Sequence, residues 1–280
     1  MNELKLSHHP GPIGVFDSGY GGLTVLNELL SEFPNFDFIY LGDNARAPYG
    51  NRSYDVVYKY TLEAVKQLFS LGAHLVILAC NTASAKALRS IQQNDLPKLD
   101  SDRRVLGVIR PSVEVLASSS HSGHVGVLGT EGTVLSNSYP LEIKKLSPQL
   151  KVTQEACPMW VPIVENNEFE SEGASFFVEK NLRLLMDRDP DIDTVVLGCT
   201  HYPLLLPLIE KHLPAHVSII SQGAIVASSL KDYLIRHPEM EKKISKSGRC
   251  LFYTSEQADK FNEAASLFLN REVISTTIYF

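Results

Sequence analysis

Short apolar runs alternate along the chain with segments of helical periodicity. Residues 13–17 and 38–41 are predicted strands, because apolar and β-branched residues fill them and turn residues follow. Apolar residues recur at helical spacing over 22–33 and from about 53 to 70. The alternation continues with further strands, which we place at the run ending in Cys80 and at 105–109, 125–128, 152–156, 195–197 and 217–220. Strands separated by helices predict an α/β protein with parallel sheets covered on both faces.

Two segments of the first half recur in the second. The run HLVILACNT at 74–82 resembles DTVVLGCTH at 193–201, since each is an apolar run that ends in a small residue, a cysteine and hydrogen-bonding side chains. The run IGVFDS at 13–18 likewise resembles VGVLGT at 125–130. The two pairs are separated by similar offsets and occur in the same order. This indicates two related α/β halves.

Composition narrows the class of protein. With 280 residues and 44% hydrophobic content, the chain can form one large or two smaller domains. A net charge of −6 with no basic stretch argues against nucleic acid as the main partner. No apolar run approaches the roughly 20 residues of a membrane span, and residues 1–12 lack the apolar core of a signal peptide.

The four cysteines are widely spaced and form no CxxC pair. We therefore expect reduced thiols in a cytoplasmic protein rather than a disulfide framework. The most linker-like interior stretch is 95–104, and 236–249 is a charged insertion before a last strand and helix.

Cys80 and Cys199 are the candidate reactive groups. Each follows a predicted strand and precedes a predicted helix, and open α/β sheets bind their ligands at this edge. A helix N-terminus also lowers the pKa of a thiol. The pair predicts a site with one thiol on each side of a small substrate. A metal site formed by both with Cys157 and His201 is the weaker alternative, because Cys-x-His without a second tight pair is a poor zinc pattern.

Five other positions are weighed as candidates for chemistry. Asp17 ends a strand before a glycine-rich turn that matches neither a P-loop nor GxGxxG, and its carboxylate can orient a base. His201, two residues after Cys199, is interpreted as an acid/base partner. The loop 43–50 reads as a surface connection in which Tyr49 and the Gly50 N–H can bind a carboxylate. Glu165 is interpreted from the sequence alone as a solvated loop charge.

Six stretches together resemble glutamate racemases, cofactor-independent enzymes of the aspartate/glutamate racemase superfamily. They are DSGYGGLTV at 17–25, YLGDNARAPYG at 40–50, LACNTASA at 78–85, GVLGTEGTV at 126–134, ACPMWVPIVE at 156–165 and LGCTHYPLL at 197–205. The resemblance implies two flavodoxin-like open-sheet domains related by pseudo-twofold symmetry, with the active site in the cleft between them. The implied domains are 1–105 with 223–280, and 106–222.

The activity implied by the resemblance is racemisation of L-glutamate to D-glutamate by 1,1-proton transfer, which supplies D-glutamate for peptidoglycan. Cys80 would act on D-glutamate and Cys199 on L-glutamate, with Asp17, His201 and Glu165 assisting. The implied substrate-binding positions are Asp17, Ser18, Tyr49, Gly50, Asn81, Thr82, Thr130, Thr200 and His201. No metal or cofactor is implied, and a homodimer is expected.

Two positions depart from the family pattern. Ser221-Gln222 stand where the family usually has Asp-Ser, and Arg110 stands where an acidic or neutral residue is common. Three other functions remain open: another racemase of the superfamily acting on aspartate or a hydantoin, a non-catalytic flavodoxin-like binding module, and a thiol-dependent hydrolase. The second cysteine argues against the last, which needs only one nucleophile and one base.

Overall fold

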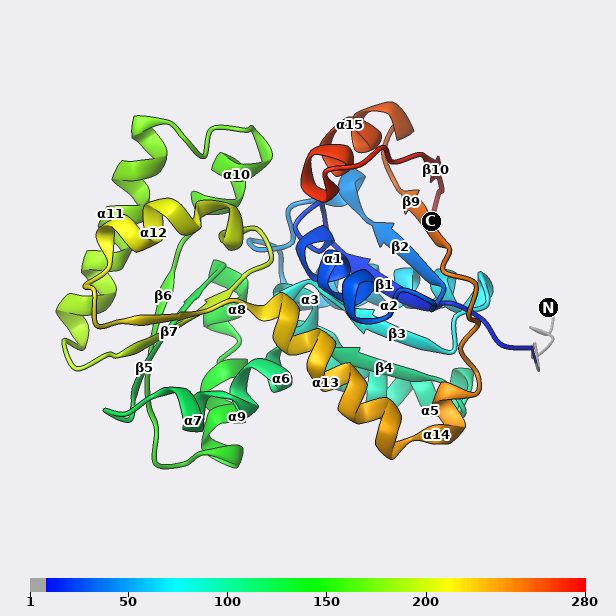
Figure 1. Cartoon of the computed structure of the whole chain (residues 1–280), viewed down its shortest axis with the longest axis horizontal. Coiled ribbons are helices and arrows are strands. Elements are labelled where there is room, and N and C mark those ends of the chain that lie inside the picture. Colours follow the sequence, from blue (N-terminus) through cyan, green and yellow to red (C-terminus); the bar gives the residue numbers. More distant parts are fainter. Residues whose placement is uncertain (1–8) are drawn as a thin grey trace.

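The chain folds into two lobes, each built on a sheet of parallel strands that is covered by helices (Figure 1). The computed structural model describes residues 9–280, apart from the side chain of Leu267. The six-stranded sheet has the order β10-β9-β2-β1-β3-β4, and the four-stranded sheet has the order β6-β5-β7-β8. The first consists of β1 (Ile13–Asp17), β2 (Phe38–Gly42), β3 (Leu75–Leu78), β4 (Arg104–Gly107), β9 (Cys250–Thr254) and β10 (Ser275–Thr277). The second consists of β5 (His124–Gly129), β6 (Lys151–Ala156), β7 (Thr194–Gly198) and β8 (Ser218–Ile220).

The two sheets share one topology. The first four strands of the six-stranded sheet lie in the order β2-β1-β3-β4, and the strands of the other sheet follow the same order as β6-β5-β7-β8. Every ladder in both sheets is parallel. This is the flavodoxin-like strand order. The prediction of two similar open parallel sheets is confirmed, and the shared order agrees with the paired sequence segments.

Alternate residues of each central strand enter opposite cores. In β3, Leu75 and Ile77 belong to one hydrophobic cluster, while Val76 and Leu78 belong to the cluster on the other face. The helices that cover the six-stranded sheet are α1 (Leu23–Glu32), α2 (Tyr54–Ser70), α3 (Asn81–Lys86), α4 (Leu88–Ser90), α5 (Leu96–Leu99), α13 (Gln222–Arg236), α14 (Pro238–Glu241) and α15 (Ala258–Leu269). A strand with two buried faces has to be apolar throughout, which explains the uninterrupted runs in the sequence.

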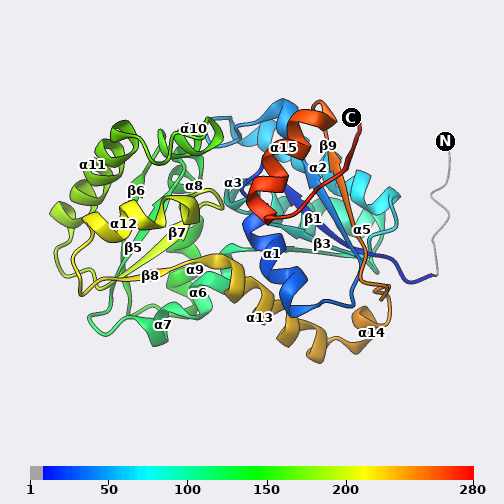
Figure 2. The ribbon, with the colours of Figure 1, turned by 45° about the horizontal axis from the view of Figure 1, so that its top comes forward.

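The same arrangement recurs around the four-stranded sheet. Val195 and Leu197 of β7 enter one cluster and Val196 enters the other. The helices of this lobe are α6 (Ile109–Glu114), α7 (Leu116–Ser119), α8 (Glu131–Leu135), α9 (Ser138–Leu146), α10 (Trp160–Glu165), α11 (Glu172–Arg188) and α12 (Leu206–His212). Helix α13 follows β8 of this lobe and packs against α1 of the other (Figure 1). In Figure 2, α3 and α8 meet where the lobes adjoin, in agreement with their contact.

Helix α2 shows how local sequence defines an element. Ser53 is its N-cap, and the Ser53 hydroxyl accepts a hydrogen bond from the N–H of Val56 at 3.4 Å. Val57, Thr61 and Leu68 lie on its buried face at helical spacing. Shortening the fully buried Leu68 to alanine would cost roughly 2–5 kcal/mol of stability.

Three predictions of local structure were wrong. The strand expected at 105–109 ends at Gly107, and Ile109 already begins α6. The linker expected at 95–104 contains α5 and follows a short π-helical segment, Ile91–Asp95, so that part of the chain is helical. The edge strand β10 had no counterpart in the prediction, because its three residues, Ser275 to Thr277, are polar.

The sequence predicts no membrane-spanning segment, and the helices of the structure can be compared with this prediction. Among the described residues, no helix combines the length and apolar character needed to cross a bilayer.

Candidate active site

The predicted site residues follow the carboxyl ends of four strands. Asp17 ends β1 and Ser18 follows it, while Cys80 lies two residues beyond β3. Thr130 follows β5 and Cys199 follows β7. β1 and β3 are neighbours in the six-stranded sheet, and β5 and β7 are neighbours in the four-stranded sheet. Their carboxyl ends are the switch points at which open α/β sheets bind ligands.

One cavity of about 230 Å³ is lined by residues of both lobes. The lining residues are Ser18, Pro48, Tyr49, Gly50, Asn51, Cys80, Asn81, Thr82, Thr130, Glu131, Cys157, Pro158, Val161, Pro162, Glu165, Cys199, Thr200 and His201. Both candidate thiols, Cys80 and Cys199, therefore face the same space, one from each sheet.

Cys80 is the N-cap residue of α3. Its Sγ accepts a hydrogen bond from the N–H of Ala83 at 3.4 Å and lies 3.4 Å from Oγ of Ser18. Burial raises the pKa of the Cys80 thiol to about 12, with the nearby Asp17 adding to it. The hydrogen bonds from Ser18 and Ala83 lower the pKa and so oppose the effect of burial. The thiol is therefore mostly protonated at neutral pH in the unliganded site.

Cys199 has a histidine as its partner. Its Sγ lies 3.8 Å from Nδ1 of His201, and Nε2 of the same ring lies 3.2 Å from Oε1 of Glu165. That second contact is at ion-pair distance without hydrogen-bond alignment. Burial lowers the pKa of His201, but the interactions with Cys199 and Glu165 outweigh it and raise the pKa to about 10. His201 is therefore held as a cation beside the thiol.

Asp17 lies behind the cavity wall rather than in it. Its carboxylate accepts a hydrogen bond from the Gly19 N–H at 2.9 Å and one from the Thr200 hydroxyl at 3.4 Å. Burial raises the pKa of the Asp17 carboxyl, while the charge of His201 acts in the opposite direction. Asp17 thus links the β1 turn of one lobe to the Cys199 motif of the other.

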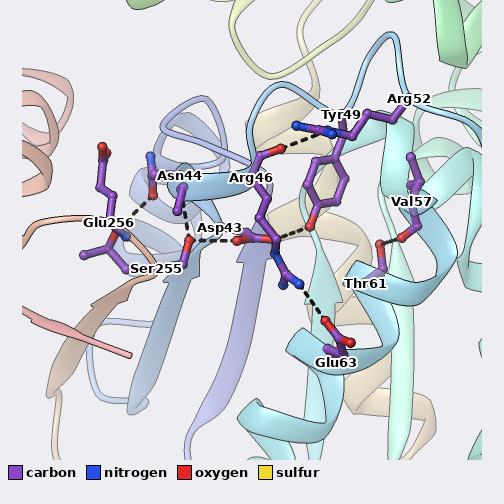
Figure 3. Close-up of polar contacts among 12 residues, drawn as sticks. Asp43, Asn44, Arg46, Tyr49, Arg52, Val57, Thr61, Glu63, Ser255 and Glu256 are labelled. Carbon is purple, nitrogen blue, oxygen red and sulfur yellow. Dashed lines mark hydrogen bonds and ion pairs between the residues drawn. The ribbon is translucent and has the colours of Figure 1, made fainter. Parts of the chain in front are cut away.

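The loop between β2 and α2 positions Tyr49 through a buried carboxylate. The Tyr49 hydroxyl donates to Asp43, which also accepts from Arg46 at 2.7 Å and from Ser255 at 2.7 Å (Figure 3). Arg46 is also paired with Glu63 at 2.5 Å. The hydroxyl of Tyr49 is therefore directed away from the cavity, and its ring and the adjacent Gly50 face the ligand space. The loop is therefore held by contacts within itself and by Ser255, which is 212 positions from Asp43 in the sequence.

Three threonine hydroxyls connect the lobes at the cavity wall. Oγ1 of Thr82 lies 2.9 Å from that of Thr130 and 3.4 Å from that of Thr133. The N–H of Gly132 donates to the Gly50 carbonyl at 2.7 Å. Thr82 and Thr130 line the cavity from opposite lobes, and their hydroxyl groups suit a polar or anionic ligand.

A family model described as Asp/Glu/Hydantoin racemase matches residues 24–230 of the chain. The chain belongs to this racemase family. A glutamate racemase of Streptococcus thermophilus is 40% identical over 268 residues, which cover 94% of this chain and 93% of that protein. The enzyme class follows from these similarities, and the chain is an amino-acid racemase.

Solved structures resemble this racemase over nearly its whole length. The crystal structure of glutamate racemase isoform RacE1 from Bacillus anthracis superposes with a TM-score of 0.88 at 34% identity, covering 98% of this chain and 99% of that one. The glutamate racemase from Francisella tularensis, solved in complex with D-glutamate, has a TM-score of 0.85 at 31% identity and covers 97% of each chain. The two-domain arrangement of the racemase is therefore that of its relatives.

Sequence reasoning misjudged or missed several residues of the racemase site. The interpretation of Glu165 as a solvated loop charge was wrong, because it ends α10, lines the cavity and approaches His201. Cys157 entered the prediction only as a metal ligand, yet it lines the cavity as a fully buried thiol. Among the described residues, the one group of ligand atoms close enough together for a metal is His124, Asp189 and Asp191, remote from the four residues of the metal alternative. Six further residues line the cavity, and only their position next to the cysteine and loop motifs could have predicted this. They are Pro48, Asn51, Glu131, Pro158, Val161 and Pro162.

Proposed function

We propose that this racemase interconverts L- and D-glutamate by two-base proton transfer at the α-carbon, with Cys80 and Cys199 as the two bases. The observation that carries the proposal is the single cavity into which both thiols project from opposite lobes. Inverting a stereocentre through a planar carbanion requires a base on one face and an acid on the other. Two like groups on related halves meet this requirement in both directions.

Glutamate is the substrate that the relatives support. The Streptococcus and Bacillus proteins are named glutamate racemases, and the Francisella protein was solved with D-glutamate. The cavity of about 230 Å³ is smaller than the roughly 300–1,000 Å³ of drug-sized pockets, which suits a small amino acid. The side chains of Asn81 and Thr82 line the cavity and can donate to its carboxylates.

The two thiols require different assistance. Cys80 lies beside Ser18 and the first turn of α3, and its raised pKa makes the unliganded thiolate scarce. In our proposal Cys80 removes the proton of D-glutamate, and Asp17 assists it. Cys199 acts on L-glutamate beside the cationic ring of His201, which is itself held by Glu165.

The developing negative charge of the carbanion needs fixed donors. The side chains of Asn81, Thr82 and Thr130 line the cavity and provide such donors. Preorganised donors of this kind stabilise transition-state charge most strongly in a buried site. In the proposed reaction, side chains of the protein itself therefore supply the bases, the acids and the hydrogen-bond donors.

The activity is tested by incubating the purified protein with L-glutamate in D₂O without added cofactor. We expect loss of optical rotation together with incorporation of one α-deuterium. Parallel reactions with aspartate and with a hydantoin identify the substrate class. Racemisation of one of these but not of glutamate would contradict the substrate, and binding without exchange of the α-proton would favour a non-catalytic module.

The proposed biological setting is the cytoplasmic supply of D-glutamate for peptidoglycan by a homodimer. Depletion in a bacterial host would test the role, because added D-glutamate should restore the cell wall. Sedimentation equilibrium tests the assembly, and we expect twice the mass of the 31.1 kDa chain. A monomer at all concentrations would contradict the homodimer.

A further inference from the structure

Gln222 lies outside the cavity but contacts Asn81, which lines it. Gln222 is the first residue of α13, the helix that follows the four-stranded sheet and packs on the other lobe. Its side chain is 3% exposed, and Asn81, beside Cys80, is 2% exposed. Nδ2 of Asn81 donates to Oε1 of Gln222 at 2.5 Å. A buried amide pair of this kind has to satisfy its remaining donors and acceptors within the protein.

Ser112 fixes the orientation of the Gln222 amide. The Ser112 hydroxyl donates its hydrogen to the carbonyl of Val108 at 2.8 Å. Its oxygen therefore accepts from Nε2 of Gln222, at 2.7 Å, and Nε2 also lies 3.3 Å from the same Val108 carbonyl. Because a carbonyl can only accept, the nitrogen of Gln222 must point toward α6. Its oxygen consequently points toward Asn81.

Tyr139 of α9 closes the network. Nε2 of Gln222 donates to the Tyr139 hydroxyl at 2.9 Å, and that hydroxyl donates to Oδ1 of Asn81 at 2.9 Å. Asn81, Gln222 and Tyr139 thus form a ring in which each side chain donates to one neighbour and accepts from the other. Ser112 fixes which way the hydrogen bonds of this ring run. The side-chain amide of Asn81 can therefore take only one orientation. Both members of the ring that hold Asn81 lie outside the cavity lining.

We infer that Gln222 is a positioning residue of the reaction, which fixes the side-chain amide of Asn81 for the substrate. This inference rests on the proposed function and adds a residue to the same site. An amide nitrogen has two N–H bonds, and Gln222 accepts one of them. The other is the donor that Asn81 presents to a substrate carboxylate. Without Gln222, rotation of the amide would place its oxygen against that carboxylate.

The test combines Gln222→Met with Asn81→Ala in a double-mutant cycle. Methionine keeps the length of the side chain and removes both polar atoms. We expect Gln222→Met to lower kcat/KM for glutamate about tenfold, the scale of one hydrogen bond to a charged group, mainly through a higher KM. In the Asn81→Ala background the same change should have no further effect, because Gln222 acts only through Asn81. Independent, multiplying effects would overturn the inference.

Two further variants make the result specific. Gln154→Met is the matched control, since Gln154 is a half-buried glutamine on β6 away from the cavity, and it should leave kcat/KM unchanged. If Gln222→Met does not fold, Tyr139→Phe removes one oxygen from the same ring and should raise KM in the same way. An unchanged KM in folded Tyr139→Phe would overturn the inference.

A crystal structure of Gln222→Met tests the inference separately from activity. The Asn81 amide rotated or in two orientations supports it, and an unchanged single orientation contradicts it. An inactive wild-type protein would overturn the proposed function, whereas this structural result concerns Gln222 alone. The two failures are therefore distinguishable.

Discussion

The charge of His201 depends on two neighbours that oppose the effect of its burial. The ring is 4% exposed, yet Cys199 and Glu165 raise its pKa to about 10 from the ordinary 6.5. A group whose pKa is higher in the folded state stabilises that state at low pH. The contribution is complete below about pH 6.5 and is lost as the pH rises through about 10. In the proposed mechanism the cationic ring is therefore a structural element as well as the partner of Cys199.

The first prediction concerns the pH dependence of stability. We expect the difference in unfolding free energy between wild type and His201→Gln to be largest near pH 6 and to shrink by a few kcal/mol toward pH 11. Denaturant titrations of both proteins across this range measure it. Glu165→Gln should remove part of the same pH-dependent difference. A difference that does not vary with pH would contradict the cationic state of His201.

At the scale of elements, the charged insertion before β9 is tied to β2 by one carboxylate. Asp37 precedes β2 and accepts hydrogen bonds from the N–H and hydroxyl of Ser247 at 3.0 and 2.7 Å and from the Arg249 N–H at 2.9 Å. Burial acts to raise the pKa of Asp37, but hydrogen bonds from Ser245, Ser247 and Arg249 outweigh it and lower the pKa to about 2. The insertion therefore joins the sheet through a group that stays ionised.

The second prediction is that Asp37→Asn destabilises the protein by about 1.5–3 kcal/mol at pH 7, the value of a hydrogen bond to a charged group. Because the folded-state pKa is lowered, this stability is present above about pH 3.8 and lost as the pH falls toward 2. Urea titration at pH 7 and at pH 2.5 measures both values. Equal losses at the two pH values would contradict the account.

Helices and strands were predicted best where the apolar residues followed one clear pattern, either an uninterrupted strand run or helical spacing. The buried strands β1, β2 and β7 match apolar runs closely, and α2 begins where its N-cap serine indicates. Strand β4 was predicted two residues too long, because an apolar residue such as Ile109 suits the end of a strand and the start of a helix equally well. Among the described residues, β10 lies at the edge of its sheet and pairs only with β9, so its polar residues carry no burial signal.

The candidate site was predictable only in part. The cysteine motifs pointed to two thiols that line the same cavity, because the motif occurs twice at strand ends. Glu165 and Gln222 act through contacts with residues 36 and 141 positions away in sequence, and no local pattern records such contacts. Asp43 was placed in an ordinary loop for the same reason, although it is fully buried and holds Tyr49.

At the scale of the whole molecule, the two lobes meet at a glycine. A Cβ on Gly21 would lie 2.5 Å from both Nδ1 of His201 and Oγ1 of Thr200, which belong to the other lobe. The hydroxyl of Thr24 in α1 also donates to the Thr200 carbonyl at 3.1 Å. We propose the domains 1–105 with 223–280, and 106–222, although β4 continues to Gly107 in the six-stranded sheet. The junction leaves no space for a side chain at position 21.

The third prediction is that Gly21→Ala lowers kcat/KM by at least about tenfold, because the methyl group displaces the His201 ring and the Thr200 hydroxyl. The matched control is Gly173→Ala in the first turn of α11, where the added Cβ meets only Oγ of Ser171 at 3.6 Å. That variant should keep full activity and gain slightly in stability. Steady-state kinetics and thermal unfolding of both variants provide the comparison, and full activity in Gly21→Ala would refute the close junction.

In the proposed mechanism Cys80 and Cys199 face opposite sides of one α-carbon. NMR measurement of α-deuterium incorporation in D₂O by Cys80→Ala and Cys199→Ala, each with both enantiomers, tests it most directly. Neither variant should racemise glutamate. Cys80→Ala should exchange the α-proton of L-glutamate only, and Cys199→Ala that of D-glutamate only. Continued racemisation by either variant, or exchange of the same enantiomer by both, would contradict the two-thiol account.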